Sequence, residues 1–160
     1  MNKVEKTLQL KYKIIAESNE LTSLEREGLH KAETASNNAY APYSKFRVGA
    51  AVLLEDKTWA FGSNQENRAY PSGMCAERVA LNHVGSNFPD QKVDSLFITA
   101  KGDFLDAEKF ITPCGACRQV ILETIHRQKA DFKLYMKNQR GEVLYISNAS
   151  SLMPWSFGEK

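Results

Sequence analysis

Three cysteines and one glutamate occupy two short segments whose composition suits a metal centre. The first segment, Cys-Ala-Glu-Arg, begins at Cys75, and the second, Pro-Cys-Gly-Ala-Cys-Arg, contains Cys114 and Cys117. Zinc in proteins prefers a tetrahedral set of sulfur and nitrogen ligands, and a catalytic zinc site keeps one position open for water. Three thiolates beside a carboxylate that is not a ligand, Glu77, therefore predict a zinc centre that activates water.

The Cys-x-x-Cys spacing at Cys114 also occurs in redox pairs of thioredoxin-like proteins. A third cysteine in the Cys75 segment and the proline before Cys114 argue against that interpretation. A non-catalytic zinc-binding or redox module nevertheless remains an alternative, and it predicts a protein that is indifferent to the loss of Glu77.

A closed structural zinc site would need a fourth ligand, and the chain has three histidines as candidates, His30, His83 and His126. On a helix beginning at Cys75, His83 lies about 12 Å along the axis from that cysteine. His126 lies about 13.5 Å from Cys117 along the axis of the second predicted helix. Neither distance allows both residues to bind one ion at about 2.0–2.3 Å. We therefore interpret the histidines as packing or surface residues and expect water as the fourth ligand.

Composition indicates one ordinary globular domain. The chain has 160 residues, of which 42% are hydrophobic and 25% charged, with a net charge of +2. That charge is too small to indicate a nucleic-acid partner. All three cysteines lie in the metal segments, so no disulfide framework is available. Because no signal peptide or membrane-spanning apolar run is recognisable, we expect a cytoplasmic protein with reduced thiols and no membrane partner.

Hydrophobic periodicity predicts the elements that carry these segments. Strict alternation over residues 7–15 predicts a strand with one buried face, formed by Leu8, Leu10, Tyr12 and Ile14. A capping box at Thr22 and Glu25 begins a helix that Pro42 closes. We expect further helices over 76–84 and 113–125, with Gly85 ending the first, and strands over 46–54, 58–61, 93–100, 132–136 and 142–146. Both metal segments then lie at helix N-termini, where the helix dipole favours thiolates. The fold class is α/β, one layered domain.

Three more motifs surround the metal segments. They are Tyr-Ala-Pro-Tyr-Ser-Lys-Phe-Arg-Val-Gly-Ala-Ala from Tyr40, Asn-Gln-Glu-Asn from Asn64, and Leu-Met-Pro-Trp-Ser-Phe from Leu152. With the metal segments, they make residues 40–157 resemble the cytidine deaminase family in its small, three-cysteine, homotetrameric form. The resemblance implies a mixed sheet of about five strands with helices on both faces. It also suggests a division into an N-terminal extension, residues 1–20, and a catalytic domain, residues 21–160.

The resemblance implies zinc-dependent hydrolytic deamination of cytidine and 2′-deoxycytidine in pyrimidine salvage. In such enzymes Cys75, Cys114 and Cys117 would bind one zinc ion per subunit, and Glu77 would carry protons between water, ring and leaving amine. Three thiolates leave the centre negatively charged, and Arg78 would offset that charge as a hydrogen-bonding neighbour of the sulfurs.

The same resemblance assigns the nucleoside contacts. Phe46 would stack on the pyrimidine, Asn64 and Glu66 would bind the ribose 3′-hydroxyl, and the backbone at Ala76 would contact the ring. In homotetrameric relatives the residues that match Tyr70 and Phe157 reach or border a neighbouring subunit's site. We therefore expect a homotetramer.

Two features depart from the family pattern. The alternating segment before residue 21 has no counterpart, and we expect it to add a strand to the sheet. Arg68 stands where relatives commonly have a small residue, which predicts a more positive pocket rim. A deaminase of an antibiotic nucleoside of the blasticidin S type is an alternative within the fold, although Phe46 and Asn64 with Glu66 favour ordinary nucleosides. Editing of a polynucleotide is disfavoured because it needs a basic channel.

Overall fold

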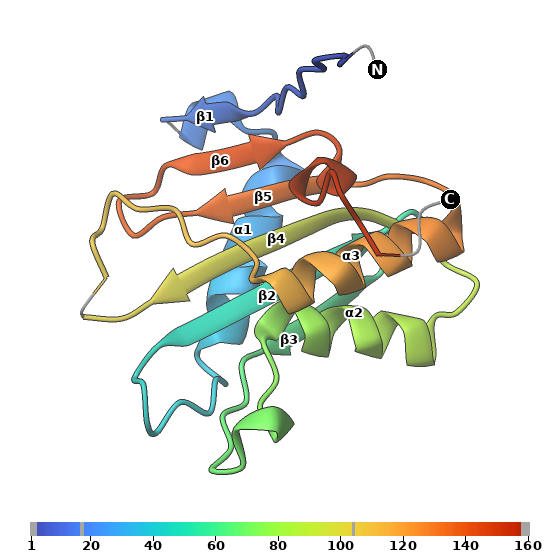
Figure 1. The fold of residues 1–160 in the computed structure, drawn as a ribbon. Helices are drawn as coiled ribbons and strands as arrows, with labels where there is room; N and C mark the ends of the chain where they lie inside the picture. Colours follow the sequence, from blue (N-terminus) through green and yellow to red (C-terminus); the bar gives the residue numbers. More distant parts are fainter. Residues whose placement is uncertain (1–2, 17, 104, 158–160) are drawn as a thin grey trace.

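A six-stranded mixed sheet forms the centre of the molecule in a computed structural model, which describes residues 3–16, 18–103 and 105–157 (Figure 1). Strands β4 and β5 are parallel, and every other neighbouring pair is antiparallel. The spatial order is β1-β6-β5-β4-β2-β3. The strands span Lys13–Ile15 (β1), Arg47–Leu54 (β2), Trp59–Ser63 (β3), Val93–Lys101 (β4), Lys133–Lys137 (β5) and Val143–Ile146 (β6).

Helices cover both faces of this sheet, as predicted. Helix α1 (Ser23–Ser36) lies on one face, and helices α2 (Ala76–Asn87) and α3 (Gly115–Gln128) lie side by side on the other (Figure 1). Short 3₁₀ turns occur at Ser18–Glu20, Tyr70–Ser72 and Ala149–Leu152. The predicted α/β layered domain is therefore confirmed, with the N-terminal strand as the sixth member of the sheet.

The apolar run of strand β2 is continuous rather than alternating because both faces of the strand are buried. Its side chains at Val48, Ala50 and Val52 pack in the core beneath α2 and α3. Ala51 and Leu53 point the other way, into the core beneath α1. A strand buried on both faces needs apolar residues at every position, which is the observed pattern.

The first helix begins where its capping box predicts. The Glu25 amide donates to the Thr22 hydroxyl, and the Thr22 amide donates to a Glu25 carboxylate oxygen at 2.7 Å. The same carboxylate accepts from the buried Tyr135 hydroxyl of β5 at 2.5 Å, which ties the helix start to the sheet. The helix ends at Ser36, however, and Pro42 does not close it.

Two predicted element boundaries are also wrong around α2 and β3. Gly85 does not end α2, which continues to Asn87. A glycine costs a helix only about 1 kcal/mol, and burial of Leu81 and Val84 against the sheet holds this turn in place. Strand β3 runs two residues beyond its predicted end, to Ser63, because it stays paired with Gly49 of β2.

The N-terminal segment is a shorter strand than its alternation predicts. Only Lys13–Ile15 pair, antiparallel to β6, because β6 itself has four residues. The expected buried face is wrong as well. Leu8, Leu10, Tyr12 and Ile14 are instead 44–62% exposed. Periodicity shows that these residues share a face, but it does not show what covers that face.

None of the helices in the described ranges is both long enough and apolar enough to cross a membrane.

Candidate zinc centre and adjoining cavity

The three cysteine sulfurs meet where the N-termini of α2 and α3 come together. Cys75 is the N-cap residue of α2, Cys114 is the N-cap residue of α3, and Cys117 lies in the first turn of α3. The Sγ atoms of Cys75 and Cys114 are 3.9 Å apart, and those of Cys114 and Cys117 are 3.5 Å apart. All three sulfurs lie within 4.8 Å of one another.

These separations fit a tetrahedral zinc ion. Zinc–sulfur bonds of about 2.3 Å at tetrahedral angles place neighbouring sulfurs about 3.8 Å apart. A disulfide would need a separation of about 2.05 Å, so the cysteines are free thiols here. Within the described part of the chain no histidine or carboxylate joins the cluster, which therefore supplies three ligands. Three ligands leave the fourth tetrahedral position to water, as a catalytic zinc site requires.

The close approach of the thiols separates their pKa values. A hydrogen bond from Cys117, with smaller contributions from Cys114 and Arg78, lowers the pKa of Cys75 to about 5. The same contact with Cys75, together with burial, raises the pKa of Cys117. One thiolate therefore forms readily even without metal, and a cation would be needed to hold all three.

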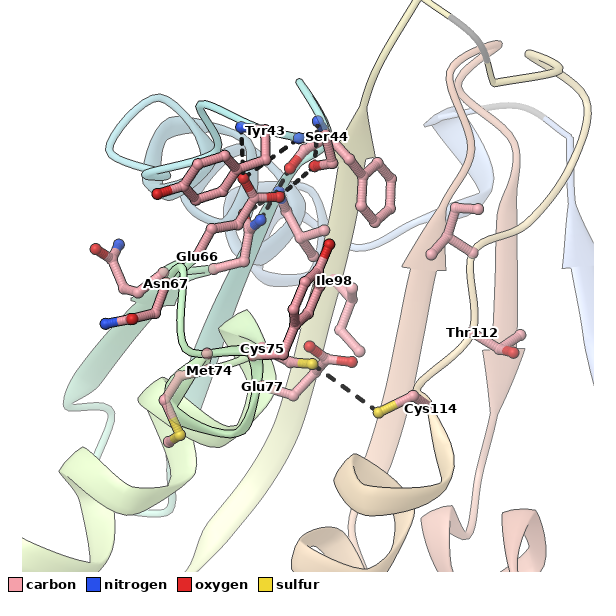
Figure 2. Close-up of a pocket in the computed structure, with 17 residues that line it drawn as sticks. Tyr43, Ser44, Glu66, Asn67, Met74, Cys75, Glu77, Ile98, Thr112 and Cys114 are labelled. Atoms are coloured by element: carbon pink, nitrogen blue, oxygen red, sulfur yellow. Dashed lines mark hydrogen bonds between the residues drawn. The ribbon is translucent and has the colours of Figure 1, made fainter.

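Glu77 lies one residue inside α2 and faces the cavity beside the sulfurs (Figure 2). Glu77 as a whole is only 6% exposed to solvent. Burial, together with the negative charge of Cys75, raises the pKa of the Glu77 carboxyl above its usual range, against a smaller lowering by its own backbone amide. A carboxyl group whose pKa is raised in this way is better able both to accept and to donate a proton.

Arg78 approaches the sulfur cluster from the same helix turn. One guanidinium nitrogen donates to the carbonyl oxygen of Gly73 at 3.0 Å. Burial opposes the charge, but a hydrogen bond to Cys75 and the negative charges of Cys75, Cys117 and Cys114 outweigh it and raise the pKa of Arg78. Its Nε atom is buried without a hydrogen-bond partner in the described part of the structure. The positive charge of Arg78 thus lies beside the sulfurs, where it can offset the negative charge of three thiolates.

A cavity of about 460 Å³ adjoins the cluster and is large enough for a small ligand (Figure 2). Seven of the predicted site residues line it, namely Phe46, Asn64, Glu66, Tyr70, Cys75, Glu77 and Cys114. They come from the start of β2, the segment after β3, and the starts of α2 and α3.

The two polar residues assigned to the sugar already make hydrogen bonds within the chain. The Asn64 side chain accepts from the Val48 amide and donates to the Phe46 carbonyl, both at 2.8 Å. The Glu66 carboxylate accepts from the backbone amides of Tyr43 and Ser44 and from the Ser44 hydroxyl. Each side chain keeps spare hydrogen-bonding capacity, since an amide has two donors and a carboxylate about four acceptor positions.

The other predicted residues lie away from the lining. Ala76 is fully buried in the core beneath α2, and Cys117 is the buried member of the sulfur cluster. Phe157 is 88% exposed, and Arg68 is also exposed. His83 lies near the far end of α2, beside Asn87 and Phe88, so its predicted separation from the cysteines is confirmed.

Several lining residues were not predicted from the sequence. Ser44 stands two residues before Phe46 in the same motif, and Thr112 and Ile111 precede the proline of the second metal segment. Their positions next to motif residues could have suggested them. Ile98 lies in the middle of β4, and only the order of strands brings it to the cavity.

A helix that packs closely on the sheet positions the first metal segment. The Gly62 backbone of β3 approaches α2 so closely that a Cβ atom there would lie 2.3 Å from the Ala76 oxygen and 2.5 Å from the Ala80 nitrogen. Only glycine permits this contact. The first turn of α2, with Cys75 and Glu77 on it, therefore depends on the absence of a side chain at Gly62.

Comparisons with known proteins agree with this geometry. Residues 22–130 match the family model described as the cytidine and deoxycytidylate deaminase zinc-binding region. A cytidine deaminase of Halalkalibacterium halodurans is 38% identical over 129 residues, covering 81% of this chain and 90% of the relative. A probable cytidine deaminase of Dictyostelium discoideum is 39% identical over 143 residues, covering 86% and 88%.

Solved structures show the same likeness. A cytidine deaminase from Burkholderia pseudomallei superposes with a TM-score of 0.71 at 32% identity, covering 86% of this chain and all of that one. Cytidine deaminase from Mycobacterium tuberculosis gives a TM-score of 0.63 at 28% identity, covering 84% and 97%. Zinc is the cofactor for which the matched region is named, and the sulfur cluster fits it. The chain therefore belongs to the zinc-dependent cytidine and deoxycytidylate deaminase family.

Proposed function

We propose that this protein hydrolyses cytidine and 2′-deoxycytidine to uridine and 2′-deoxyuridine with release of ammonia. The observation that carries the proposal is the buried carboxyl group of Glu77, which faces the cavity beside the three-sulfur cluster. Relatives that cover most of this chain are named as cytidine deaminases, which supports the same substrate class.

The reaction replaces the amino group at C4 of the pyrimidine by an oxygen from water. When bound to Cys75, Cys114 and Cys117, zinc supplies hydroxide near neutral pH by lowering the pKa of water. Glu77 accepts the proton that the attacking water loses and transfers it to N3 of the ring. Glu77 then accepts the proton of the hydroxyl group now bonded to C4 and delivers it to the departing amine, so that a carbonyl group and ammonia result. Burial supports these transfers because it raises the pKa of Glu77.

Arg78 would tune the same centre from beside the sulfurs. Three thiolates give the zinc site a net negative charge, which weakens its effect on water. A guanidinium that interacts with the Cys75 sulfur withdraws part of that charge. The Gly73 carbonyl that Arg78 also holds keeps the side chain in this position.

For substrate recognition, we assign the pyrimidine face to Phe46, the sugar 3′-hydroxyl to Asn64 and Glu66, and a ring contact to the Ala76 backbone. The first three side chains line the cavity, and Asn64 and Glu66 retain capacity for one hydroxyl group. A site built to bind a sugar hydroxyl would discriminate against the free base, whose binding would leave these groups unpaired.

We further infer a homotetramer that acts in cytoplasmic pyrimidine salvage, with residues 1–20 as an N-terminal extension of a catalytic domain formed by 21–160. Tyr70 lines the cavity although it is 90% exposed, and Phe157 is 88% exposed, as expected for residues that a neighbouring subunit would cover. Three unpaired thiols suit a reducing compartment.

The test combines metal analysis with ultraviolet assays on purified protein. We expect about one zinc per chain and turnover of cytidine and 2′-deoxycytidine, with little on cytosine or blasticidin S. Glu77→Gln keeps the volume of the side chain and should lower kcat about 10²- to 10⁴-fold while zinc stays bound.

Glu123→Gln, at an exposed position of α3, is the matched control and should retain activity. Zinc binding without turnover, or activity that survives Glu77→Gln, would contradict the deaminase proposal. Turnover of cytosine comparable with that of cytidine would overturn only the sugar contacts.

A further inference from the structure

The loop that leads into β2 is held in place by hydrogen bonds at both ends of the Phe46 residue. Its carbonyl accepts from the Asn64 side chain at 2.8 Å, and its amide donates to the Ser44 hydroxyl oxygen at 3.0 Å. Phe46 lines the cavity, so these two bonds determine where one wall of the cavity stands. Asn64 was expected from the sequence to act at this site, but Ser44 was not.

Ser44 also contacts the second polar residue of the cavity. Its hydroxyl donates to the Oε1 atom of Glu66, while the other carboxylate oxygen accepts from the backbone amides of Tyr43 at 2.9 Å and Ser44 at 3.3 Å (Figure 2). Among the causes that lower the pKa of Glu66, the hydrogen bond from Ser44 is the largest. One hydroxyl group therefore connects the carboxylate and the Phe46 backbone.

The hydrogen bonds that Glu66 already makes decide which of its lone pairs is left for a ligand. A carboxylate has about four acceptor positions, and the loop occupies three of those on Glu66. The remaining position lies on Oε1, the oxygen that Ser44 holds. The direction in which Glu66 offers its spare lone pair therefore depends on Ser44.

The backbone between Ser44 and Phe46 also needs support. Lys45 has a φ of 58°, in the left-handed region that non-glycine residues seldom occupy. The Ser44 hydroxyl spans this residue by accepting from the Phe46 amide, and the Lys45 amide donates to the Ala41 carbonyl at 3.1 Å. Without the hydroxyl, the loop would lose one of the bonds that keep Lys45 in this conformation.

We infer that Ser44 is a positioning residue of the nucleoside site, which orients the Glu66 carboxylate toward the sugar and places Phe46 against the base. The inference rests on the proposed function and adds to it a residue that touches no reacting atom. Ser44 is exposed, so its replacement should leave the fold intact.

Ser44→Ala tests this role by kinetics. We expect KM for cytidine to rise about 5- to 10-fold, as for the loss of one hydrogen bond of ordinary strength, with kcat within twofold. Since Glu66 acts on the sugar, the ratio of kcat/KM for cytidine to that for 2′,3′-dideoxycytidine should fall about fivefold. A general disturbance of the loop would lower both values equally and leave the ratio unchanged.

Two further variants complete the design. Ser44→Thr keeps the hydroxyl and should restore most of the loss, whereas Ser86→Ala, at an exposed position of α2, should behave as wild type. A KM of Ser44→Ala within twofold of wild type, or an unchanged ratio, would overturn the inference.

Hydrogen exchange provides a readout that does not need activity. The Phe46 amide should exchange about tenfold faster in Ser44→Ala than in wild type, because its acceptor is gone. Equal exchange would refute the positioning role even in a protein that deaminates cytidine. Absence of cytidine turnover by wild type, by contrast, would refute the proposed function and with it the role of Ser44 in the site.

Discussion

At the scale of single residues, the centre depends on opposite charges held close together. Glu77 is buried beside thiols, which raises the pKa of its carboxyl group, while Arg78 sits next to the same sulfurs and is held cationic by them. The two neighbours in sequence thus perform different tasks on one metal centre. Glu77 would move protons, whereas Arg78 would adjust how strongly the metal acts on water.

Replacing Arg78 by glutamine tests its effect on the metal centre separately from proton transfer by Glu77. We expect Arg78→Gln to lower kcat about 10- to 100-fold, in the range typical of groups that hydrogen-bond metal ligands, because the thiolate charge would no longer be offset. Zinc content by atomic absorption and kcat by ultraviolet assay are the measurements. Arg127→Gln, at an exposed arginine of α3, is the control. Unchanged kinetics with normal zinc content would refute the electrostatic role.

At the scale of elements, the first turns of α2 and α3 determine where the ligands lie. Each helix begins at a cysteine N-cap, and each is packed on the same face of the sheet. Helix α2 can approach β3 only because Gly62 has no side chain. The position of the metal ligands therefore depends on how closely α2 packs on β3, although Gly62 lies well outside the ligand segments.

This dependence makes Gly62→Ala a sharp test. A Cβ atom there would meet the backbone of Ala76 at 2.3 Å and that of Ala80 at 2.5 Å, so α2 must shift outward. Overpacking of this kind costs about 1–3 kcal/mol, and we expect a lower Tm together with weaker zinc retention during dialysis against a chelator.

Gly115→Ala is the matched control for that substitution. Its added Cβ atom would meet nothing within 4 Å, and Gly115 stands in the first turn of α3. Calorimetry should show wild-type stability for this variant. A Gly62→Ala protein as stable and as rich in zinc as wild type would contradict the positioning of α2 by close packing.

At the scale of the whole molecule, large apolar side chains remain exposed at several places in the described part of the chain. One is the N-terminal segment beside β6, where Leu8, Leu10, Tyr12 and Ile14 share an uncovered face. Elsewhere, Tyr70 at the cavity and, separately, Trp155 and Phe157 near the C-terminus are each at least 88% exposed. Large aromatic groups left in solvent favour an assembly that covers them.

Sedimentation of the purified protein tests the proposed assembly. We expect a species of four times the chain mass of 18.0 kDa at assay concentrations. Phe157→Ser should lower activity if this ring borders a neighbour's site, whereas Val4→Ser, at another exposed apolar position, should not. A monomeric mass with full activity would contradict both the tetramer and the shared site.

Much of the fold was predictable because local patterns record local structure. The capping box at Thr22 and the apolar runs of β2 and β4 correspond to observed elements, and the cysteine segments do begin helices. Errors occurred where a boundary depends on a distant partner. The N-terminal strand is short because β6 is short, and Gly85 stays helical because its neighbours are buried.

The sequence by itself determined the chemistry of this protein, since three thiols, one carboxylate and one guanidinium are properties of residue types and their spacing. Only the tertiary structure decided which of these groups meet. Cys75 and Cys114 are 39 residues apart in the chain, and Ser44 and Glu66 are 22 apart. Such contacts follow from strand order and helix packing, which depend on how distant surfaces bury one another and not on any local pattern. The zinc centre was thus foreseeable from its ligands, whereas the contact between Ser44 and Glu66 required the folded molecule.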